Sequence, residues 1–322
     1  MQVLSPAKLN LFLRVARPRA DGFHPLLSWM CRISLFDTIT FERTTERGRV
    51  SLTCDDPALA TDESNLIVRA VRALDASLIN AGERSRLGDS GLAISLHKRI
   101  PQGGGLGGGS SNAGTTLLAL DDLWESRRGR DFLHDIAAKI GSDVPFFIHG
   151  PSSVCTGRGE IIQPTPAPQA RHACLFMPDM HLATPAVYRK FDELLTPATV
   201  DEDELRGLSF TVESSGEEMH HLKASPATIE VDRAGGPEHG ALLPAAELMT
   251  RLVNDLEPPA FALQPALATL RLQLQQTLGR VVRMSGSGST LFTLFDSAPE
   301  AQAAAELVAI RMKIKIRAVE VG

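Results

Sequence analysis

From Lys98 to Leu120 the sequence reads K-R-I-P-Q-G-G-G-L-G-G-G-S-S-N-A-G-T-T-L-L-A-L. Six glycines fall within residues 103–109, and Ser-Ser-Asn follows at residues 110–112. Glycine has no Cβ, so such a run can turn sharply and bring backbone N–H groups against an anion. A serine or asparagine within residues 110–112 would cap the following helix, whose N-terminus adds unpaired donors and a partial positive charge. The stretch therefore predicts a phosphate-binding loop.

Glycine-rich runs also occur as flexible linkers, so the sequence on either side of the loop matters. Residues 92–97 alternate as a strand does, Pro101 marks the end of that strand, and residues 113–124 form an apolar helical run. A linker is not usually held between two buried elements, and this context favours a functional loop. The loop has no Lys-Ser/Thr after its last glycine and does not open as G-x-G-x-x-G, so neither a Walker A motif nor a dinucleotide-binding fold is expected.

Composition indicates an ordinary globular chain of one large domain or two domains. The 322 residues are 43% hydrophobic and 22% charged, with a net charge of −5. This balance gives no general electrostatic case for binding nucleic acid or an anionic membrane. A local basic patch could still bind a phosphorylated small molecule.

The four cysteines are scattered without a C-x-x-C pair, so reduced thiols are expected and a metal cluster is not. No signal peptide and no apolar run approaching about 18 residues is visible. A cytoplasmic protein without a membrane span is therefore expected. The sequence leaves its state open between a monomer and a homodimer.

In the first half, residues 3–17 alternate as a strand that begins near Lys8. Asp21-Gly22 predicts a turn before Phe23-His24-Pro25, and residues 26–36 and 37–42 are expected to form two strands. Asp-Glu-Ser-Asn at residues 62–65 predicts the start of a helix over residues 66–78. Asp143 stands between a glycine turn and an apolar run, residues 144–148, which is interpreted as a strand. Taken singly, Lys8 is more typical of a solvated lysine, Asp143 of a turn former and His24 of a surface histidine.

The second half alternates strands and helices, which predicts an α+β sandwich. Its expected elements include helices over residues 242–256 and 265–278 and a strand over residues 291–295. The Pro- and Ala-rich residues 163–170 are the expected boundary between a domain at residues 1–165 and another at residues 171–322. Residues 196–240 are polar and poor in aliphatics, which predicts an extended insertion. A second small-residue loop, S-G-S-G-S-T, occupies residues 285–290.

Three motifs coexist in this chain: P-A-K-L-N-L near the start, P-x-G-G-G-L-G-G-G-S-S-N in the middle and M-S-G-S-G-S-T near the end. Together they resemble the GHMP kinase family over almost the whole chain except the polar insertion. One branch, the kinases of 4-diphosphocytidyl-2-C-methyl-D-erythritol in the non-mevalonate isoprenoid pathway, is more similar. That branch shares D-G-F-H-x-L (residues 21–26), N-L-I-V-R-A (65–70), G-x-D-V-P-F-F (141–147) and N-D-L-E (254–257).

The resemblance implies a two-domain α+β GHMP kinase fold. Its N-terminal domain would resemble ribosomal protein S5 domain 2, and its C-terminal domain would be ferredoxin-like. It also implies ATP-dependent phosphorylation of the 2-hydroxyl of a small-molecule substrate that carries cytidine diphosphate, with Mg²⁺ as a second cofactor.

Carried over motif by motif, the resemblance implies that Asp143 is the general base and Lys8 its partner. Substrate contacts would come from Asn10, Phe23, His24, Thr184 and Tyr188. Contacts to ATP would come from Asn65, Leu66, Pro101, Gly103, Gly104, Gly105, Leu106, Gly107, Gly108, Gly109, Ser110 and Ser111.

The chemistry is consistent with these roles. Phosphoryl transfer depends mostly on positioning and on stabilising charge at the transferring oxygens. A carboxylate can accept the proton of the attacking hydroxyl, and a lysine beside it adds positive charge near the γ-phosphate. Mg²⁺ would be held mostly by phosphate oxygens and water, so no protein metal site is predicted. Phe23 or Tyr188 can stack on a base, and His24 can read its edge.

The chain departs from its branch at Phe23, where tyrosine is usual, at Pro25, where threonine or asparagine is usual, and in the length of the insertion. Two other interpretations stay open. The chain could be another GHMP kinase, of homoserine or mevalonate type, or a catalytically inactive member that acts by binding. The Phe23-His24 pair favours a cytidine-bearing substrate over homoserine or mevalonate. Intact Lys8 and Asp143 argue against a catalytically inactive member.

Overall fold

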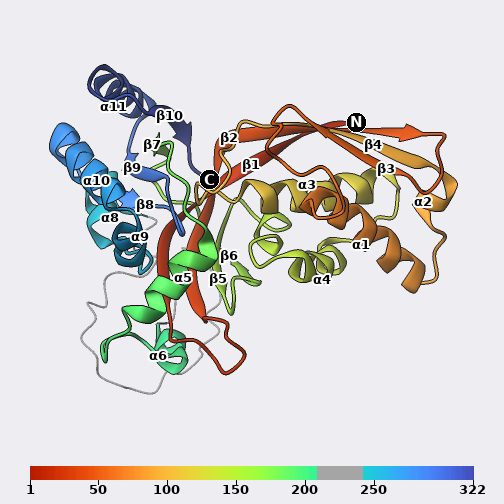
Figure 1. Cartoon of the computed structure of the whole chain (residues 1–322), viewed down its shortest axis with the longest axis horizontal. Helices are drawn as coiled ribbons and strands as arrows, with labels where there is room; N and C mark the ends of the chain where they lie inside the picture. Colours follow the sequence, from red (N-terminus) through yellow and green to blue (C-terminus); the bar gives the residue numbers. More distant parts are fainter. Residues whose placement is uncertain (209–241) are drawn as a thin grey trace, which may run out of the picture.

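The computed structural model describes residues 1–208 and 242–322. Its elements form two antiparallel-rich sheets flanked by helices, so the expected α+β class is confirmed (Figure 1). The larger part of the predicted insertion, residues 209–240, lies outside the described residues. Within the described ranges, no helix combines the length and apolar character needed to cross a bilayer.

The first sheet is built around one long strand, β2. It has six strands in the order β3-β4-β2-β5-β6, with β1 also paired to β2. Among the strand pairs of this sheet that the structure describes, β3–β4 is parallel and the others are antiparallel. The strands are β1 (Gln2–Val15), β2 (Leu26–Thr44), β3 (Val50–Cys54), β4 (Gly91–His97), β5 (Ser152–Thr156) and β6 (Ile161–Pro164).

Strand β2 pairs with different strands along its length. β4 pairs with its second half and β5 with its first, while β1 runs beside almost all of it. Two irregularities interrupt the β1–β2 register, between Pro6 and Ala7 and between Asn10 and Phe12. A bulge of this kind bends a strand and re-aims its side chains. The sequence suggested separate strands at residues 26–36 and 37–42; the structure joins them.

Helices cover one face of the first sheet (Figure 1). The apolar faces of α1, α3 and α4 meet residues such as Ile39, Phe41 and Ile94 in one buried cluster. Asn65 caps α1 by accepting the N–H of Ile67 at 2.9 Å, as the Asp-Glu-Ser-Asn signal predicts. The helices of this half are α1 (Leu66–Asn80), the short α2 (Arg86–Asp89), α3 (Gly108–Leu123) and α4 (Arg130–Ile140), with a 3₁₀ turn η1 (Pro145–Phe147).

The second sheet has four antiparallel strands in the order β10-β7-β9-β8. They are β7 (His172–Met177), β8 (Arg283–Met284), β9 (Leu291–Phe295) and β10 (Lys315–Glu320). The helices of this half are α5 (Thr184–Glu193), α6 (Glu202–Gly207), α8 (Ala245–Arg251), α9 (Glu257–Leu263), α10 (Pro265–Leu278) and α11 (Ala298–Arg311).

The core of the second half lies on both faces of its sheet. One face packs with α5, α9, α10 and α11 around Phe176 and Leu291. The other face packs with α8 and with Leu9 and Trp29 of the first sheet. Of the helix expected over residues 242–256, only Ala245–Arg251 is helical. The chain then bridges to Leu13, and α9, which the sequence did not predict, begins at Glu257.

The two halves are joined where α8 and the second sheet pack against the first sheet. Leu13 donates its N–H to Val253 O at 2.8 Å and accepts from the N–H of Asp255 at 3.0 Å. At the other end of the interface, Ile33 of β2 pairs with Val321. The last strand of the first sheet in chain order ends at Pro164, and the first strand of the second sheet begins at His172. The division into domains at residues 1–165 and 171–322 stays a prediction.

Candidate active site

The three sequence motifs meet through hydrogen bonds between their backbones and one serine. The N–H of Lys8 in β1 donates to Leu106 O in the glycine loop at 2.9 Å. Ser285 joins the other two motifs, because its Oγ donates to Gly105 O at 3.0 Å and accepts the N–H of Asn10 at 3.1 Å. Segments up to 275 residues apart in the sequence therefore border one space.

Helix α3 starts inside the glycine run rather than after it. Gly107 is its N-cap, with φ +68° in the left-handed region that glycine adopts without cost, and Gly108 is its first residue. The expectation that residues 110–112 would supply the cap is wrong. Ser111 is buried instead, with its hydroxyl 2.7 Å from that of Ser5.

A cleft of about 490 Å³ opens where the motifs meet. The expected ATP-binding residues that line it are Asn65, Leu66, Pro101, Gly103, Gly104, Gly105, Leu106, Gly107, Gly108, Gly109 and Ser110. The other expected residues that line it are Lys8, Asn10, Asp143, Thr184 and Tyr188. Ser111, Phe23 and His24 are not part of this lining.

Lys8 and Asp143 form an ion pair in the wall of the cleft. Lys8 Nζ lies 3.5 Å from Asp143 Oδ2 and also donates to Asn10 Oδ1. The lysine side chain is 5% exposed and the aspartate 32%, so the carboxylate faces the open space while the ammonium stays behind it. A carboxylate so placed can accept a proton from a hydroxyl group bound in the cleft.

The segment after Asp143 is not the strand that its apolar run suggested. Val144 caps the 3₁₀ turn η1, and all residues from Val144 to Ile148 are buried. Burial on every side produces a continuous apolar run whatever the backbone does, so periodicity could not identify this turn. Gly114 of α3 allows η1 to approach, because a Cβ there would lie 2.8 Å from that of Phe147.

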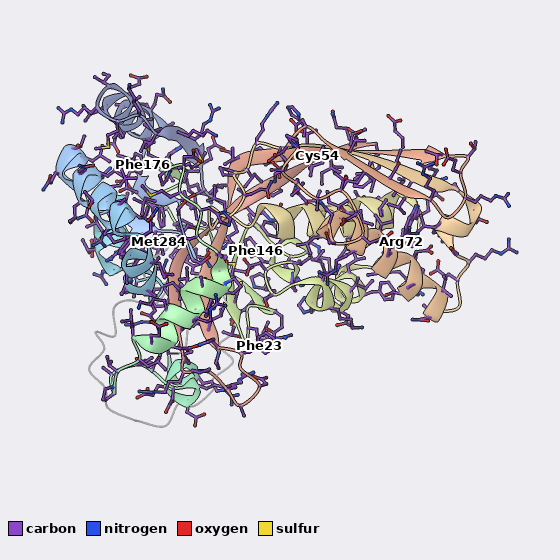
Figure 2. All side chains as sticks on the ribbon, viewed as in Figure 1. Phe23, Cys54, Arg72, Phe146, Phe176 and Met284 are labelled. Carbon is purple, nitrogen blue, oxygen red and sulfur yellow. The ribbon has the colours of Figure 1, made fainter. Side chains whose placement is uncertain are left out.

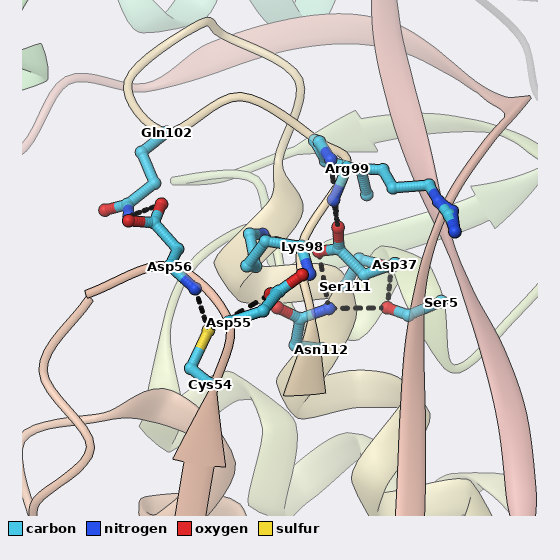
Figure 3. A network of polar contacts seen from close by, with 11 residues as sticks. Ser5, Asp37, Cys54, Asp55, Asp56, Lys98, Arg99, Gln102, Ser111 and Asn112 are labelled. Atoms are coloured by element: carbon cyan, nitrogen blue, oxygen red, sulfur yellow. Dashed lines mark hydrogen bonds and ion pairs between the residues drawn. The ribbon is translucent and has the colours of Figure 1, made fainter. Parts of the chain in front are cut away.

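A buried ion pair that the sequence analysis missed supports the start of the glycine loop (Figure 3). Asp37 of β2 is fully buried and lies 2.5 Å from Lys98 Nζ. Its oxygens also accept from the N–H groups of Arg99 at 2.7 Å and Ile100 at 2.9 Å, and from Asn112 Nδ2 at 3.0 Å. One carboxylate thus fixes both the entry to the loop and the first turn of α3. The available signal was an acid within an apolar strand, L-F-D-T-I.

A second set of contacts ties the same loop to the end of β3 (Figure 3). Asp55 accepts the N–H of Lys98 at 2.8 Å, and Asp56 accepts from Gln102 Nε2 at 2.9 Å. Asp56 in turn directs its N–H to the sulfur of Cys54 at 3.4 Å. The loop is therefore anchored on both sides before its glycines begin.

The start of α1 faces the open end of the glycine loop. Asn65 uses Oδ1 for its cap and Nδ2 for Ala60 O at 2.6 Å, and Leu66 is half-buried beside Gly109. Both residues line the cleft. Leu66 offers an apolar surface and Asn65 a polar one, which together suit a planar ring system.

Two aromatic rings of α5 surround His24, and one of them, that of Tyr188, lines the cleft. The ring of Tyr188 lies 5.0 Å from that of His24, and Phe191 lies 5.8 Å from it on another side. The side chain of His24 is 8% exposed, and its Nε2 is 2.7 Å from Asp192 Oδ1. The structure therefore brings His24 and Tyr188 together, next to the cleft but with only Tyr188 in its lining.

Phe23 lies apart from this pair. Its side chain is 47% exposed at the end of the β1–β2 hairpin, and the guanidinium carbon of Arg158 lies 4.7 Å from its ring centroid. Figure 2 labels it below Phe146, toward the outer end of the hairpin. No sequence pattern indicated a contact between Phe23 and Arg158.

Asn10 and Thr184 hold the middle of the cleft. Asn10 Nδ2 donates to Ser28 Oγ at 2.8 Å while its Oδ1 accepts from Lys8. The hydroxyl of Thr184, at the start of α5, lies 2.8 Å from that of Ser287. The second small-residue loop is thus linked to α5 across the cleft.

The environment of Asp143 also affects its neighbours. Burial, with a smaller contribution from the negative charge of Asp143, raises the pKa of Tyr188 above its ordinary value. The same two causes raise the pKa of Cys155 well above that of a free thiol. Both groups therefore stay protonated across the physiological range, and the Tyr188 hydroxyl remains a donor.

Comparison with known proteins identifies both halves of the chain. Residues 65–151 match the model of the GHMP kinases N terminal domain, and residues 238–313 match that of the GHMP kinases C terminal domain. A curated protein of Prochlorococcus marinus (strain MIT 9313), named 4-diphosphocytidyl-2-C-methyl-D-erythritol kinase, is 36% identical over 309 residues. That match covers 95% of this chain and 88% of the relative.

Solved structures give the same picture. A crystal structure of a 4-(cytidine 5'-diphospho)-2C-methyl-D-erythritol kinase superposes with a TM-score of 0.70 at 32% identity, covering 100% of this chain and 99% of that one. Homoserine kinase from Cytophaga hutchinsonii superposes with a TM-score of 0.68 at 16% identity, covering 99% and 95% of the two chains. At that identity the second likeness concerns the fold alone.

Proposed function

The chain belongs to the GHMP kinase family, and we propose that it transfers the γ-phosphoryl group of ATP to the 2-hydroxyl of 4-diphosphocytidyl-2-C-methyl-D-erythritol. The expected two-domain GHMP kinase fold is confirmed by the same comparisons. One observation carries the proposal: the Lys8–Asp143 pair lies in a cleft that the glycine loop and the Tyr188 ring also line. A kinase for this substrate needs a loop for the phosphates, a proton acceptor and a ring that can stack on cytosine.

The glycine loop fits the phosphates of ATP. A Cβ at Gly107 would lie 2.9 Å from Lys8 Cγ, and one at Gly108 would lie 3.0 Å from Ile100 Cγ2 and 3.2 Å from Lys98 Nζ. Only glycine fits so closely against these side chains, and the two glycines place the unpaired N–H groups at the N-terminus of α3 beside the cleft that they line. We assign the phosphates to residues 103–110 and the adenine to Asn65 and Leu66.

Mg²⁺ fits this site as an ion carried mainly by phosphates and water. Residues 1–208 and 242–322 contain no cluster of three or more His, Cys, Asp or Glu side chains suited to a metal. Ser110 is the predicted hydroxyl that faces the cleft, whereas Ser111 bonds to Ser5. When bound, the ion neutralises negative charge on the phosphate oxygens.

Asp143 takes the proton of the substrate hydroxyl as the new bond forms. Lys8 holds the carboxylate at 3.5 Å and adds positive charge where the transferring oxygens gather. Asn10 fixes the lysine in turn, because Asn10 is itself held by Ser28. The base is thus positioned by a chain of contacts that starts in β2.

The cytidine end is assigned to Phe23, His24 and Tyr188. The His24–Tyr188 pair offers a ring edge and a ring face side by side, and Asp192 orients the imidazole. Thr184 and Asn10 are assigned to the middle of the substrate. We further propose that the enzyme works in the cytoplasm as a monomer or homodimer and acts on this small molecule without nucleic acid or membrane.

An ADP-release assay with ATP, Mg²⁺ and the diphosphocytidyl substrate tests the activity. Turnover on this substrate is expected. Turnover only on homoserine or mevalonate would contradict the proposal in favour of another kinase of the family, and no turnover on any of them would favour a binding protein.

Asp143→Asn tests the mechanism. The variant should lose about a hundredfold or more of kcat, because the proton acceptor is gone, while its affinity for ATP stays near normal. Asp122→Asn, on an exposed position of α3, is the matched control and should keep wild-type turnover. Near-normal kcat in Asp143→Asn would remove this residue from the mechanism.

A further inference from the structure

The turn between β5 and β6 adjoins the proposed catalytic base. It spans residues 157–160 and contains two glycines with positive φ, Gly157 at +70° and Gly159 at +111°. A Cβ at Gly159 would lie 3.5 Å from Ser142 O and 3.7 Å from Asp143 Oδ1. Gly157 O accepts the N–H of Leu26 at 2.8 Å, which fixes the turn to the start of β2.

Arg158 is the side chain that this turn presents. Its guanidinium lies 4.7 Å from the centroid of the Phe23 ring. Its ion pair with Glu160 is long, with 3.7 Å between Nε and Oε1, whereas its backbone N–H donates to Glu160 Oε2 at 2.6 Å. The residue therefore extends from a turn beside Asp143 to the ring of Phe23.

The proposed substrate must cross this interval. Its acceptor alcohol belongs at Asp143 and its cytosine near Phe23 and His24, so the diphosphate that joins them runs between the two. Two negative phosphates need cationic or N–H partners on their way. The backbone of Arg158 lies in the turn beside Asp143, and its guanidinium lies at Phe23.

The neighbouring cations are already engaged with carboxylates. Lys8 pairs with Asp143, and Lys98 pairs with the buried Asp37 at 2.5 Å. Arg19 holds Glu202 with two hydrogen bonds, of 2.7 and 2.5 Å. Arg158 has the weaker acid contact, and a guanidinium can exchange such a contact for a phosphate that it binds with two parallel hydrogen bonds.

We propose that Arg158 binds the diphosphate of the substrate, and that it selects for a nucleoside diphosphate linkage over an uncharged nucleoside. The proposal rests on the proposed function. Stacking on Phe23 holds the guanidinium of Arg158 beside the cytidine subsite. Arg158 therefore both contacts the Phe23 ring and faces the phosphates.

Binding of cytidine and of CDP, measured by calorimetry, separates the two contributions of Arg158. A non-hydrolysable ATP analogue is kept saturating so that CDP cannot occupy the ATP loop. Wild-type protein should bind CDP more tightly than cytidine. Arg158→Ala should weaken CDP about tenfold or more and change cytidine little, because the lost contacts are charge-assisted hydrogen bonds to phosphate. Arg158→Lys should retain part of the preference.

Turnover provides a second readout. Arg158→Ala should raise the KM for the diphosphocytidyl substrate by a similar factor and leave the KM for ATP unchanged. Arg47→Ala, on the exposed turn between β2 and β3, removes one arginine elsewhere and should change none of these constants.

Three results would contradict the proposal, and they differ from one another. Equal weakening of CDP and cytidine in Arg158→Ala would mean that the arginine only braces Phe23. Unchanged affinity for both would remove Arg158 from the site. Failure of the wild-type protein to bind either compound would overturn the cytidine-specific function, and the role of Arg158 with it.

Discussion

At the scale of single residues, Gly105 shows how closely the two small-residue loops approach. It has φ +73°, and a Cβ there would lie 2.1 Å from the carbonyl oxygen of Ser285. Two costs would therefore fall on any other residue: the left-handed backbone conformation and a clash with a main-chain atom that cannot rotate away. Gly82 has φ +85°, but a Cβ there would meet no atom within 4 Å beyond its chain neighbours, so it carries only the first cost.

Gly105→Ala and Gly82→Ala separate these costs. Gly105→Ala should lower the free energy of unfolding by about 2 kcal/mol more than Gly82→Ala does, since overpacking adds to backbone strain. It should also raise the KM for ATP, because the loop must shift. Chemical denaturation and steady-state kinetics measure both effects, and equal losses in the two variants would contradict the tight contact.

The residue scale also explains why Asp37 and Arg158 were missed. Asp37 stands in an apolar strand, and only the folded chain shows that Lys98, Asn112 and two backbone N–H groups surround it. Arg158 has no motif around it except two glycines. Lys8 and Asp143 were found through the family motifs rather than through any property of the isolated residues.

At the scale of elements, helix α6 shows how a short helix is held in place. It has only six residues, with a capping box in which Asp201 and Glu204 exchange hydrogen bonds. Glu202 ties it to the end of the β1–β2 hairpin through Arg19 and also accepts from Arg206 at 2.6 Å. The hydrogen bond from Arg19, followed by that from Arg206, lowers the pKa of Glu202 to about 2.

This lowered pKa predicts where α6 loses its tie to the hairpin. A carboxyl with a depressed folded-state pKa contributes fully above its unfolded value of 4.5, and the contribution is lost as pH falls through about 2. An NMR titration of the Glu202 carboxyl should give a midpoint near that lower value. Arg19→Gln should move the midpoint upward, toward 4.5, and a wild-type midpoint already near 4.5 would contradict the contact.

Element boundaries were predicted well where local signals agree with the tertiary structure. Helix α10 and strand β9 begin and end where the pattern placed them, at Pro265–Leu278 and Leu291–Phe295. The start of α3 was missed because the helix begins among the glycines: Ser111 bonds to Ser5 of β1, and Ser110 lines the cleft. The η1 turn was missed because its run is buried on all sides, and such runs carry no period.

At the scale of the whole molecule, burial decides the chemistry of the cysteines. All four are free thiols, as expected. Desolvation raises the pKa of Cys31 and of Cys174 to about 12, and it raises that of Cys155 well above the ordinary value. Cys54 is half-buried at the end of β3, and burial is also the main cause of its raised pKa.

Iodoacetamide at about pH 8 should therefore alkylate Cys54 alone, and slowly, in the native protein, because thiolates are the reactive form. Mass spectrometry of the native and the unfolded protein gives the measurement. Four modified cysteines should appear after unfolding, which provides the control. Rapid labelling of Cys31 or Cys174 in the native state would contradict the burial of these two thiols.

The arrangement of the two halves was accessible only through family resemblance. The sequence shows each loop separately, but nothing in its spacing reveals that Gly105 and Ser285, 180 residues apart, share a hydrogen bond. The local patterns determined the class of most elements. The cleft depends on contacts between segments that no local pattern relates.

Strand β2 connects the parts of this cleft directly. It begins at Leu26, immediately after His24 and Pro25, and carries Asp37, which anchors the glycine loop, eleven residues further on. Inserting one residue between these points would slide one pocket past the other by roughly 3.3 Å and turn the following side chains to the opposite face. The length of this one strand therefore sets the distance between the end of the hairpin at His24 and the anchor of the glycine loop at Asp37.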